Sequence, residues 1–290
     1  MNTTPKTIQI FLPGGSPTGI RVAEITTRIV QLIDMPRKLL PDFLKMPEST
    51  QVGVYYLVAE PEDGSEPQVY IGQTGDLRTR LAEHDSKKDF WERALVLISR
   101  TQTLTQTHAL FLEWLSIHSS RKAGRYQDSN GNSGSLPHTP APMEADCLEI
   151  FETGRTLLST LGHPLFESVV QAPKDETEAE YFYCVSPTGG VNAKGLYTQE
   201  GFVVLAGSVG RKNNVPSIVG TSDANFREKL IGAGVMKVEG DTVVFAKDHL
   251  FRSPSMAAVA VLGRTANGWV EWKDKDGKTL DALKRQAINS

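Results

Sequence analysis

Two strand candidates joined by a short loop, and followed at once by a helix, constrain the fold of this chain more than any other feature. The segments VGVYYLV (52–58) and QVYIGQ (68–73) are rich in β-branched and aromatic residues, and the loop between them consists mainly of Pro, Asp, Gly and Glu. Asp76 is then a suitable N-cap for a helix over 76–86, in which apolar residues recur one turn apart. The sequence therefore predicts a β-hairpin followed by an amphipathic helix.

The segments that follow extend this pattern. ERALVLIS (92–99) predicts a strand, and THALFLEWLSIHSSRK (107–122) predicts a helix with a broad apolar face. Ser, Gly, Asn and Pro dominate residues 126–145, which predicts an irregular loop before a further helix over 145–161. The expected order of elements from residue 52 to 122 is ββαβα.

Length and composition indicate an α+β protein of more than one domain. The chain has 290 residues, of which 39% are hydrophobic and 22% charged, and such a chain is globular and long enough for two domains. Alternating apolar residues near the start predict a β-hairpin and a short helix, an N-terminal appendage over 1–48. We expect a first domain over 49–172 and, after the charged segment KDETEAE, a second α+β domain over 173–290.

The second domain is expected to contain mainly short strands. Five segments have strand character, the last of them NGWVEWKD (267–274), where an Asn-Gly pair predicts a tight turn. Helices are expected near 223–233 and over 254–262.

Charge, cysteine content and hydropathy exclude several classes of protein. Residues 1–172 carry 16 Lys and Arg against 20 Asp and Glu, and residues 173–290 carry 15 against 14, so neither half is strongly basic. Any contact with nucleic acid must therefore use a local basic face. Cys147 and Cys184 are the only cysteines, which excludes a disulfide framework and a cysteine-based zinc site. Without an apolar segment that could span a membrane, we expect a soluble, cytoplasmic protein with no membrane partner.

Five residues in the first domain are of types that can together hydrolyse a phosphodiester bond. Tyr55 and Tyr70 lie on the two predicted hairpin strands, and Arg80 and His84 lie four residues apart on one face of the next helix. Glu113 lies on the long helix that follows. A guanidinium can bind the negative charge that builds on a phosphate, and a carboxylate can hold a metal ion. A tyrosine is a poor base unless His84 or the metal lowers its pKa.

Each of these residues also has an ordinary structural explanation. The two tyrosines can be aromatic residues that pack on a sheet, and Arg80 and His84 can lie on a solvated helix face. Glu113 has the spacing of a polar stripe that faces water. Five such residues in this order are more consistent with one shared site.

The order and spacing of these residues resemble those of the GIY-YIG nuclease family over residues 52–128. The first motif reads GVY at 53–55 and the second YIG at 70–72, and Arg80 and His84 follow the second tyrosine by ten and fourteen residues. The resemblance implies a small ββαβα fold and hydrolysis of DNA promoted by one divalent metal ion, usually Mg²⁺.

The same resemblance assigns roles to single residues. Tyr55, Tyr70, Arg80 and His84 match catalytic positions of the family, and Glu113 matches its catalytic, metal-binding glutamate. Family members also tend to have an asparagine shortly after this helix, which makes Asn130 a candidate for contact with nucleic acid. Arg78 lies on the other side of its helix from Arg80 and is a candidate for contact with a DNA phosphate.

The C-terminal segments resemble an uncharacterised bacterial domain that often follows GIY-YIG modules. They also resemble, more weakly, a module of restriction and modification systems that is proposed to bind modified DNA. Trp269 and Trp272 follow the predicted Asn-Gly turn, and aromatic side chains presented in this way can stack on bases, although they can equally fill a core. These two residues are the candidates for nucleic-acid contact in the second domain.

The hypothesis from the sequence is a metal-dependent DNA endonuclease, with DNA as partner and Mg²⁺ or another divalent metal as cofactor. The second domain would sense or target DNA. Because one active site cuts one strand at a time, double-strand cleavage would need a homodimer or two encounters. Two alternatives stay open: a DNA-binding regulatory protein that keeps the fold without activity, and a nuclease that acts on RNA.

Overall fold

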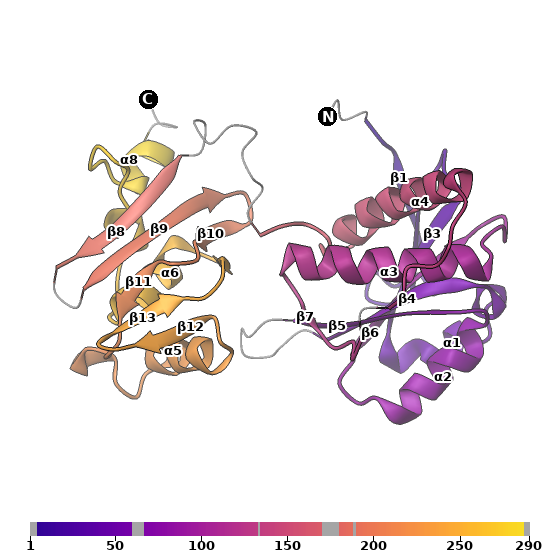
Figure 1. The fold of residues 1–290 in the computed structure, drawn as a ribbon, viewed down its shortest axis with the longest axis horizontal. Helices are drawn as coiled ribbons and strands as arrows, with labels where there is room; N and C mark the ends of the chain where they lie inside the picture. The colour runs from indigo at the N-terminus through magenta and orange to yellow at the C-terminus, as the bar shows by residue number, and fades with distance from the viewer. Residues whose placement is uncertain (1–4, 60–66, 133, 170–179, 188–189, 287–290) are drawn as a thin grey trace. The chain divides into compact units, whose positions relative to one another are not determined.

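The computed structural model describes residues 5–59, 67–132, 134–169, 180–187 and 190–286. The chain forms two compact units, one up to Ser168 and the other from Val169, and each is described by itself (Figure 1). The protein is α+β, as expected, with two seven-stranded sheets and eight α-helices among these residues. The domain boundary expected near residue 173 falls outside the described residues. None of the described helices is long and apolar enough to cross a membrane.

The first unit is built on a sheet with the strand order β1-β2-β3-β6-β4-β5-β7. Neighbouring strands are antiparallel except for β5 and β7, which are parallel. The strands are β1 (Ile8–Phe11), β2 (Arg21–Ile25), β3 (Val30–Pro36), β4 (Gly53–Ala59), β5 (Gln68–Thr74), β6 (Arg93–Ser99) and β7 (Gln127–Asp128).

The N-terminal segment is part of this sheet, which corrects the expected appendage over 1–48. Strand β3 pairs with β6 along its whole length. Asp34 of β3 is completely buried, and Arg21 of β2 and Arg93 of β6 both bind its carboxylate. A buried carboxylate needs such partners, because burying an unpaired charge costs roughly several kcal/mol. Local alternation predicted the hairpin but not its pairing with β6.

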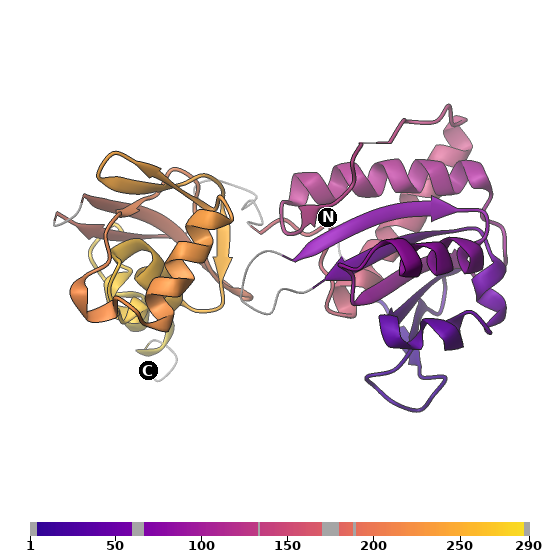
Figure 2. The ribbon, with the colours of Figure 1, turned by 90° about the horizontal axis from the view of Figure 1, so that it is seen from below.

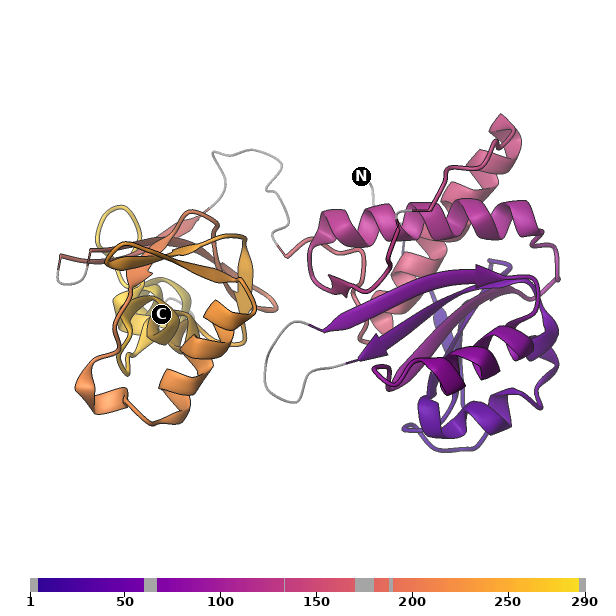
Figure 3. The same ribbon diagram turned by 60° about the horizontal axis from the view of Figure 1, so that its bottom comes forward.

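Helices cover both faces of the first sheet. The short helix α1 (Leu40–Phe43) and α2 (Leu77–Lys87) pack on one face, and α3 (Gln106–Ala123) and α4 (Ala141–Thr160) pack on the other (Figures 2 and 3). The elements β4, β5, α2, β6 and α3 follow one another in the order that the sequence predicts. Helix α4 begins a turn earlier than expected, because prolines are tolerated in a first helical turn.

Helix α2 is positioned by its cap and by its apolar face. The carboxylate of Asp76 accepts a hydrogen bond from the backbone N–H of Arg78 at 3.0 Å. Leu77, Leu81 and His84 are the buried residues of this helix, and their spacing places all three on the side that faces the sheet. The side chain of His84 is thereby held against strand β4.

The second unit has its own sheet, with the strand order β12-β13-β11-β9-β10-β14 and with β8 paired to β9. All of its strand pairs are antiparallel. The strands are β8 (Tyr181–Ser186), β9 (Val191–Thr198), β10 (Gly201–Val204), β11 (Val209–Arg211), β12 (Met236–Glu239), β13 (Thr242–Phe245) and β14 (His249–Phe251). The helices are α5 (Ser222–Gly232), α6 (Pro254–Leu262), α7 (Gly268–Glu271) and α8 (Leu280–Lys284).

The segment expected as a final strand after an Asn-Gly turn forms helix α7 instead. The side chain of Asn267 accepts a hydrogen bond from the backbone N–H of Trp269 at 3.2 Å and so caps this helix. At Gly268, a Cβ atom would lie 2.0 Å from the carbonyl oxygen of Pro254. The glycine therefore allows a close approach to α6 and does not form a hairpin turn.

Candidate active site at the edge of the first sheet

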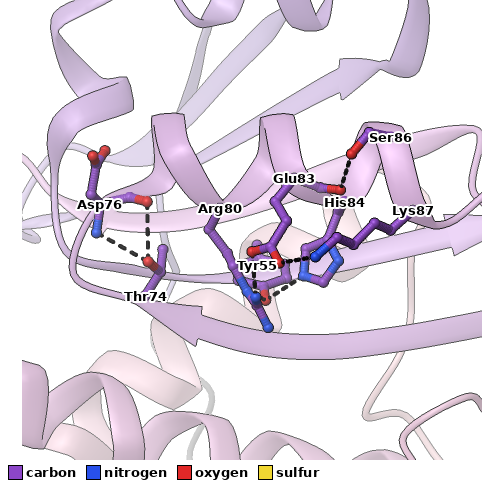
Figure 4. A network of polar contacts seen from close by, with 8 residues as sticks. All are labelled: Tyr55, Thr74, Asp76, Arg80, Glu83, His84, Ser86 and Lys87. Carbon is purple, nitrogen blue, oxygen red and sulfur yellow. Dashed lines mark hydrogen bonds and ion pairs between the residues drawn. The ribbon is translucent and has the colours of Figure 1, made fainter.

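The hydroxyl of Tyr55 lies at the centre of a hydrogen-bonded chain between β4 and α2 (Figure 4). Arg80 Nε donates to Tyr55 Oη at 3.2 Å, and Tyr55 Oη lies 2.8 Å from His84 Nε2. Because a guanidinium can only donate, the tyrosine oxygen accepts from Arg80. Towards His84 the hydroxyl donates to Nε2 in one tautomer of the histidine and accepts from it in the other.

Gly72 makes room for this tyrosine. It lies opposite Tyr55 in the register of β4 and β5. A Cβ atom at Gly72 would lie 2.3 Å from Tyr55 Oη and 2.4 Å from its Cζ. The glycine of the YIG segment is therefore needed because the ring of Tyr55 lies across it. Sequence reasoning did not give this glycine a role.

Tyr70 joins the cluster through its ring. Its ring centre lies 6.4 Å from that of Tyr55 and 5.2 Å from that of His84. The ammonium of Lys88 lies 4.0 Å from the centre of the Tyr70 ring, at a cation–π distance. Lys88 is a cation of this site that sequence reasoning missed, and its position just after α2 was the only signal for it.

Glu113 approaches from the opposite side of the sheet. It lies on α3, and its Oε1 accepts a hydrogen bond at 3.2 Å from the backbone N–H of Gln73 in β5. Its carboxylate interacts electrostatically with Arg80 and with Tyr55. The structure thus brings Tyr55, Tyr70, Arg80 and His84 into one cluster. Glu113 contacts the β5 backbone from the other face of the sheet, within electrostatic range of that cluster.

The ionisation of Tyr55 and His84 is shifted in opposite directions. Burial, opposed by the hydrogen bond from Arg80, raises the pKa of Tyr55 above its usual range. Burial, together with the positive charges of Arg80 and Lys88, lowers the pKa of His84 to about 4. At neutral pH His84 is therefore uncharged and can accept the proton of Tyr55 at Nε2. The hypothesis from the sequence required a lowered tyrosine pKa, so that the tyrosine could act as a base. In the structure the pKa of Tyr55 is instead raised.

Arg80 is also held by a carboxylate that sequence reasoning missed. Its Nη1 donates to Glu83 at 2.7 Å, and Lys87 binds the same carboxylate at 2.7 Å. Hydrogen bonds from Lys87 and then from Arg80 lower the pKa of Glu83 to about 2. The three-residue spacing of Arg80 and Glu83 on a helix was the available signal. A phosphate that binds Arg80 has to compete with this ion pair.

Glu113 is the residue of this cluster that can hold a metal ion. Burial raises the pKa of its carboxyl group, although the hydrogen bond from Gln73 and the charge of Arg80 oppose the shift. A cation beside this carboxylate would lower its pKa and so oppose the effect of burial. Within the described ranges, no three His, Cys, Asp or Glu residues are grouped to bind a metal ion. One carboxylate fits Mg²⁺, which keeps several waters and is often shared between one or two carboxylates and a phosphate.

The two other candidates in the first unit have structural contacts of their own. Arg78 is exposed, and its Nε donates to Ser49 Oγ at 3.1 Å, away from Tyr55. Asn130 binds both backbone groups of Ile71: it accepts from the N–H at 3.0 Å and donates to the carbonyl at 2.6 Å. The side chain of Asn130 therefore caps the outer edge of β5. Contact of Arg78 or Asn130 with nucleic acid stays a prediction.

The two tryptophans of the second unit differ in accessibility. Trp272 is completely buried, its Nε1 donates to the carbonyl of Pro254 at 3.0 Å, and its ring centre lies 4.4 Å from that of Phe202. It is a core residue and cannot stack on a base in this fold, which corrects its assignment. Trp269 is half-buried, with the guanidinium of Arg285 3.5 Å from its ring centre.

Comparison with known proteins supports the expectation of an uncharacterised domain in the second unit. It supports no expectation for the first unit. No match to the nuclease family is found over the first unit. No curated protein and no solved structure matches the chain. The expectation of an uncharacterised C-terminal domain is confirmed, since residues 182–284 match a family described as a domain of unknown function, DUF4357.

Proposed function

We propose that the first unit is a metal-dependent endonuclease that hydrolyses phosphodiester bonds of DNA. The observation that carries this proposal is the hydrogen-bonded chain from Arg80 through Tyr55 to a neutral His84, with the carboxylate of Glu113 in electrostatic range. The tyrosine, histidine and carboxylate can move protons or bind a metal ion, and the arginine can bind a phosphate. The likeness of their spacing to GIY-YIG nucleases supports the same conclusion.

Tyr55 and His84 would act together as the base. The attacking water gives a proton to Tyr55 Oη while the hydroxyl proton of Tyr55 passes to His84 Nε2. One O–H bond of water breaks, the O–H bond of tyrosine is replaced, and an N–H bond forms on histidine. The hydroxide then forms a bond to phosphorus, the bond from phosphorus to the leaving oxygen breaks, and the leaving oxygen takes a proton from solvent. An imidazolium with a pKa near 4 returns its proton to solvent readily.

Arg80 would bind the non-bridging oxygens of the phosphate. Its guanidinium is already oriented by the hydrogen bond to Tyr55, so little side-chain entropy is lost when a phosphate displaces Glu83 from it. Negative charge on the bound phosphate would also raise the pKa of the neighbouring His84 and make it a better proton acceptor.

Glu113 would hold Mg²⁺ beside this phosphate. The metal ion would neutralise charge on the phosphate and polarise its bond to the leaving oxygen. The backbone N–H of Gln73 orients the carboxylate through one oxygen.

The experiment that tests the proposal is incubation of the full chain with supercoiled plasmid DNA and a matched RNA, in Mg²⁺ or in chelator. We expect nicked plasmid in Mg²⁺ only. Glu113→Gln should abolish nicking while DNA binding in chelator stays close to wild type, because the change removes a charge and keeps the shape. Arg78→Ala is a comparison variant outside the Tyr55 cluster and should lose much less activity.

Three results would overturn the proposal or replace it by an alternative. Nicking by Glu113→Gln at the wild-type rate would remove this residue from the site. DNA binding without any cleavage in Mg²⁺ or Mn²⁺ would favour the regulatory protein. Cleavage of RNA alone would make the enzyme an RNA-directed nuclease.

A further inference from the structure

The second sheet has one face that its helices do not cover. Successive side chains of a strand point to opposite faces, and residues such as Phe182, Ala193 and Phe202 belong to the core that includes α6. Figure 3 shows the helices of this unit on that side of the sheet. The alternate residues of each strand therefore point away from all the described helices of the unit. This face is not accessible throughout, because Val203 of β10 is completely buried, whereas Tyr183 and Lys194 are half-buried and Lys273 is exposed.

The strand register shows which side chains meet on this face. Tyr183 of β8 lies between Lys194 of β9 and Lys273, which pairs with it on the other side. The neighbouring row places Tyr181 opposite Leu196. We use the name open sheet face for six residues: Tyr181, Tyr183, Lys194, Leu196, Lys237 and Lys273.

The charge of the open sheet face is positive. The register places four basic residues on this side of the sheet, Lys194, Arg211, Lys237 and Lys273, and one acidic residue, Glu239. Lys237 and Lys273 are exposed, and Glu239 shares a row with Arg211. The face therefore keeps an excess of cations, although the second unit as a whole is nearly neutral.

Aromatic rings and ammonium groups lie close together on this face. The ammonium of Lys194 lies 3.6 Å from the centre of the Tyr181 ring. Tyr181 and Tyr183 are two residues apart on one strand, so their Cα atoms are separated by roughly 6.5–7 Å. Two rings at this spacing can each meet the face of one unstacked base, while the lysines between and beside them meet phosphates.

We propose that the open sheet face binds a single strand of nucleic acid, with a base stacked on Tyr183 and phosphates on Lys194 and Lys273. A duplex fits less well, because its base faces are stacked inside the helix and cannot reach the tyrosine rings. A second copy of the same face fits less well too, because its lysines would oppose these lysines. The inference goes beyond the proposed nuclease activity and does not depend on it.

The test measures binding of the full chain to labelled oligonucleotides by fluorescence anisotropy, in chelator so that any cleavage is silent. The probes are oligo-dT and oligo-U of about 12 nucleotides, a length within the range of known single-strand sites, and a hairpin duplex of DNA. We expect both single strands, or one of them, to bind more tightly than the duplex. The two single-strand probes show whether the partner is DNA or RNA.

The variants separate stacking from charge. Tyr183→Leu should weaken single-strand binding about 10-fold, the effect of losing one base–aromatic stack. Lys273→Ala should reduce the slope of log affinity against log salt by about 0.7, the value for one phosphate contact on a single strand. Tyr197→Leu and Lys229→Ala are the matched controls on the helix side, and Tyr197 is 39% exposed. Both controls should bind like wild type.

Circular dichroism and thermal melting establish that each variant is folded. If Tyr183→Leu is unstable, the exposed Lys273→Ala decides the question alone. The proposal is overturned by wild-type single-strand binding of both face variants, or by equal losses in the controls. It is also overturned if gel filtration shows a dimer that Tyr183→Leu dissociates. Failure of plasmid nicking leaves these binding results unaffected.

Discussion

Replacing Gly72 by alanine tests the geometry of the candidate site directly. The added Cβ atom would lie 2.3 Å from Tyr55 Oη and 2.9 Å from Cε2, whereas carbon atoms in proteins pack at about 3.5–4 Å. The ring therefore has to move by roughly 1 Å or more, which breaks the hydrogen bonds of 2.8 Å to His84 and 3.2 Å to Arg80. A displacement of this size in a catalytic group typically costs on the order of 100-fold in rate.

The same change should also destabilise the first unit. Inserting a methyl group into a packed site typically costs about 1–3 kcal/mol, and a domain of this size loses roughly 2–4 °C in Tm for each kcal/mol. We therefore expect Tm of the first unit to fall by about 2–12 °C and plasmid nicking to fall about 100-fold.

A matched glycine and a double variant complete this experiment. At Gly75, an added Cβ would meet only the end of the flexible Gln106 side chain at 3.2 Å, so Gly75→Ala should change neither Tm nor rate by much. In a Tyr55→Phe background the hydroxyl clash is absent, so Gly72→Ala should cost less stability there than in wild type. Wild-type Tm and nicking of Gly72→Ala would refute the packing argument.

Three further predictions address single residues. Arg80→Ala should lose at least about 100-fold in nicking rate and Arg78→Ala much less, and equal losses would show that the roles of the two arginines are wrongly assigned. The folded pKa of His84, about 4, lies below its ordinary value of 6.5, so this group contributes stability above pH 6.5 that is lost as the pH falls towards 4. Chemical denaturation of wild type and His84→Asn over this range should show a smaller pH dependence in the variant, and identical dependence would contradict the shift. Trp272→Ala should destabilise the second unit by about 3–5 kcal/mol and Trp269→Ala by less, which thermal melting can compare.

The local sequence was sufficient to predict the elements that carry the candidate site. Residues 53–123 form strand, strand, helix, strand and helix in the expected order, because alternation, caps and helical periodicity are properties of neighbouring residues. The spacing of Arg80 and His84 placed both on one helix, and the structure brings both to the hydroxyl of Tyr55. The candidates could therefore be named from the sequence, although their contacts could not.

Other features depend on residues that are far apart in the chain, and only the tertiary structure decided them. The first three strands join the main sheet through the pairing of β3 with β6, where the buried Asp34 binds Arg93, 59 residues away. The Asn-Gly pair at 267–268 begins a helix because Gly268 packs against the carbonyl of Pro254 in α6. Trp272 is buried in the same region, since its indole donates to that carbonyl.

The roles of Gly72 and Glu113 also depend on contacts between different elements of the fold. Gly72 is required because the ring of Tyr55 lies across it from the neighbouring strand, and Glu113 reaches β5 from a helix on the other face of the sheet. Sequence patterns report the periodicity of a single element. The burial of a charge, the close approach of two backbones and the accessibility of a ring depend on which elements pack together, and this is set by the free energy of the whole fold.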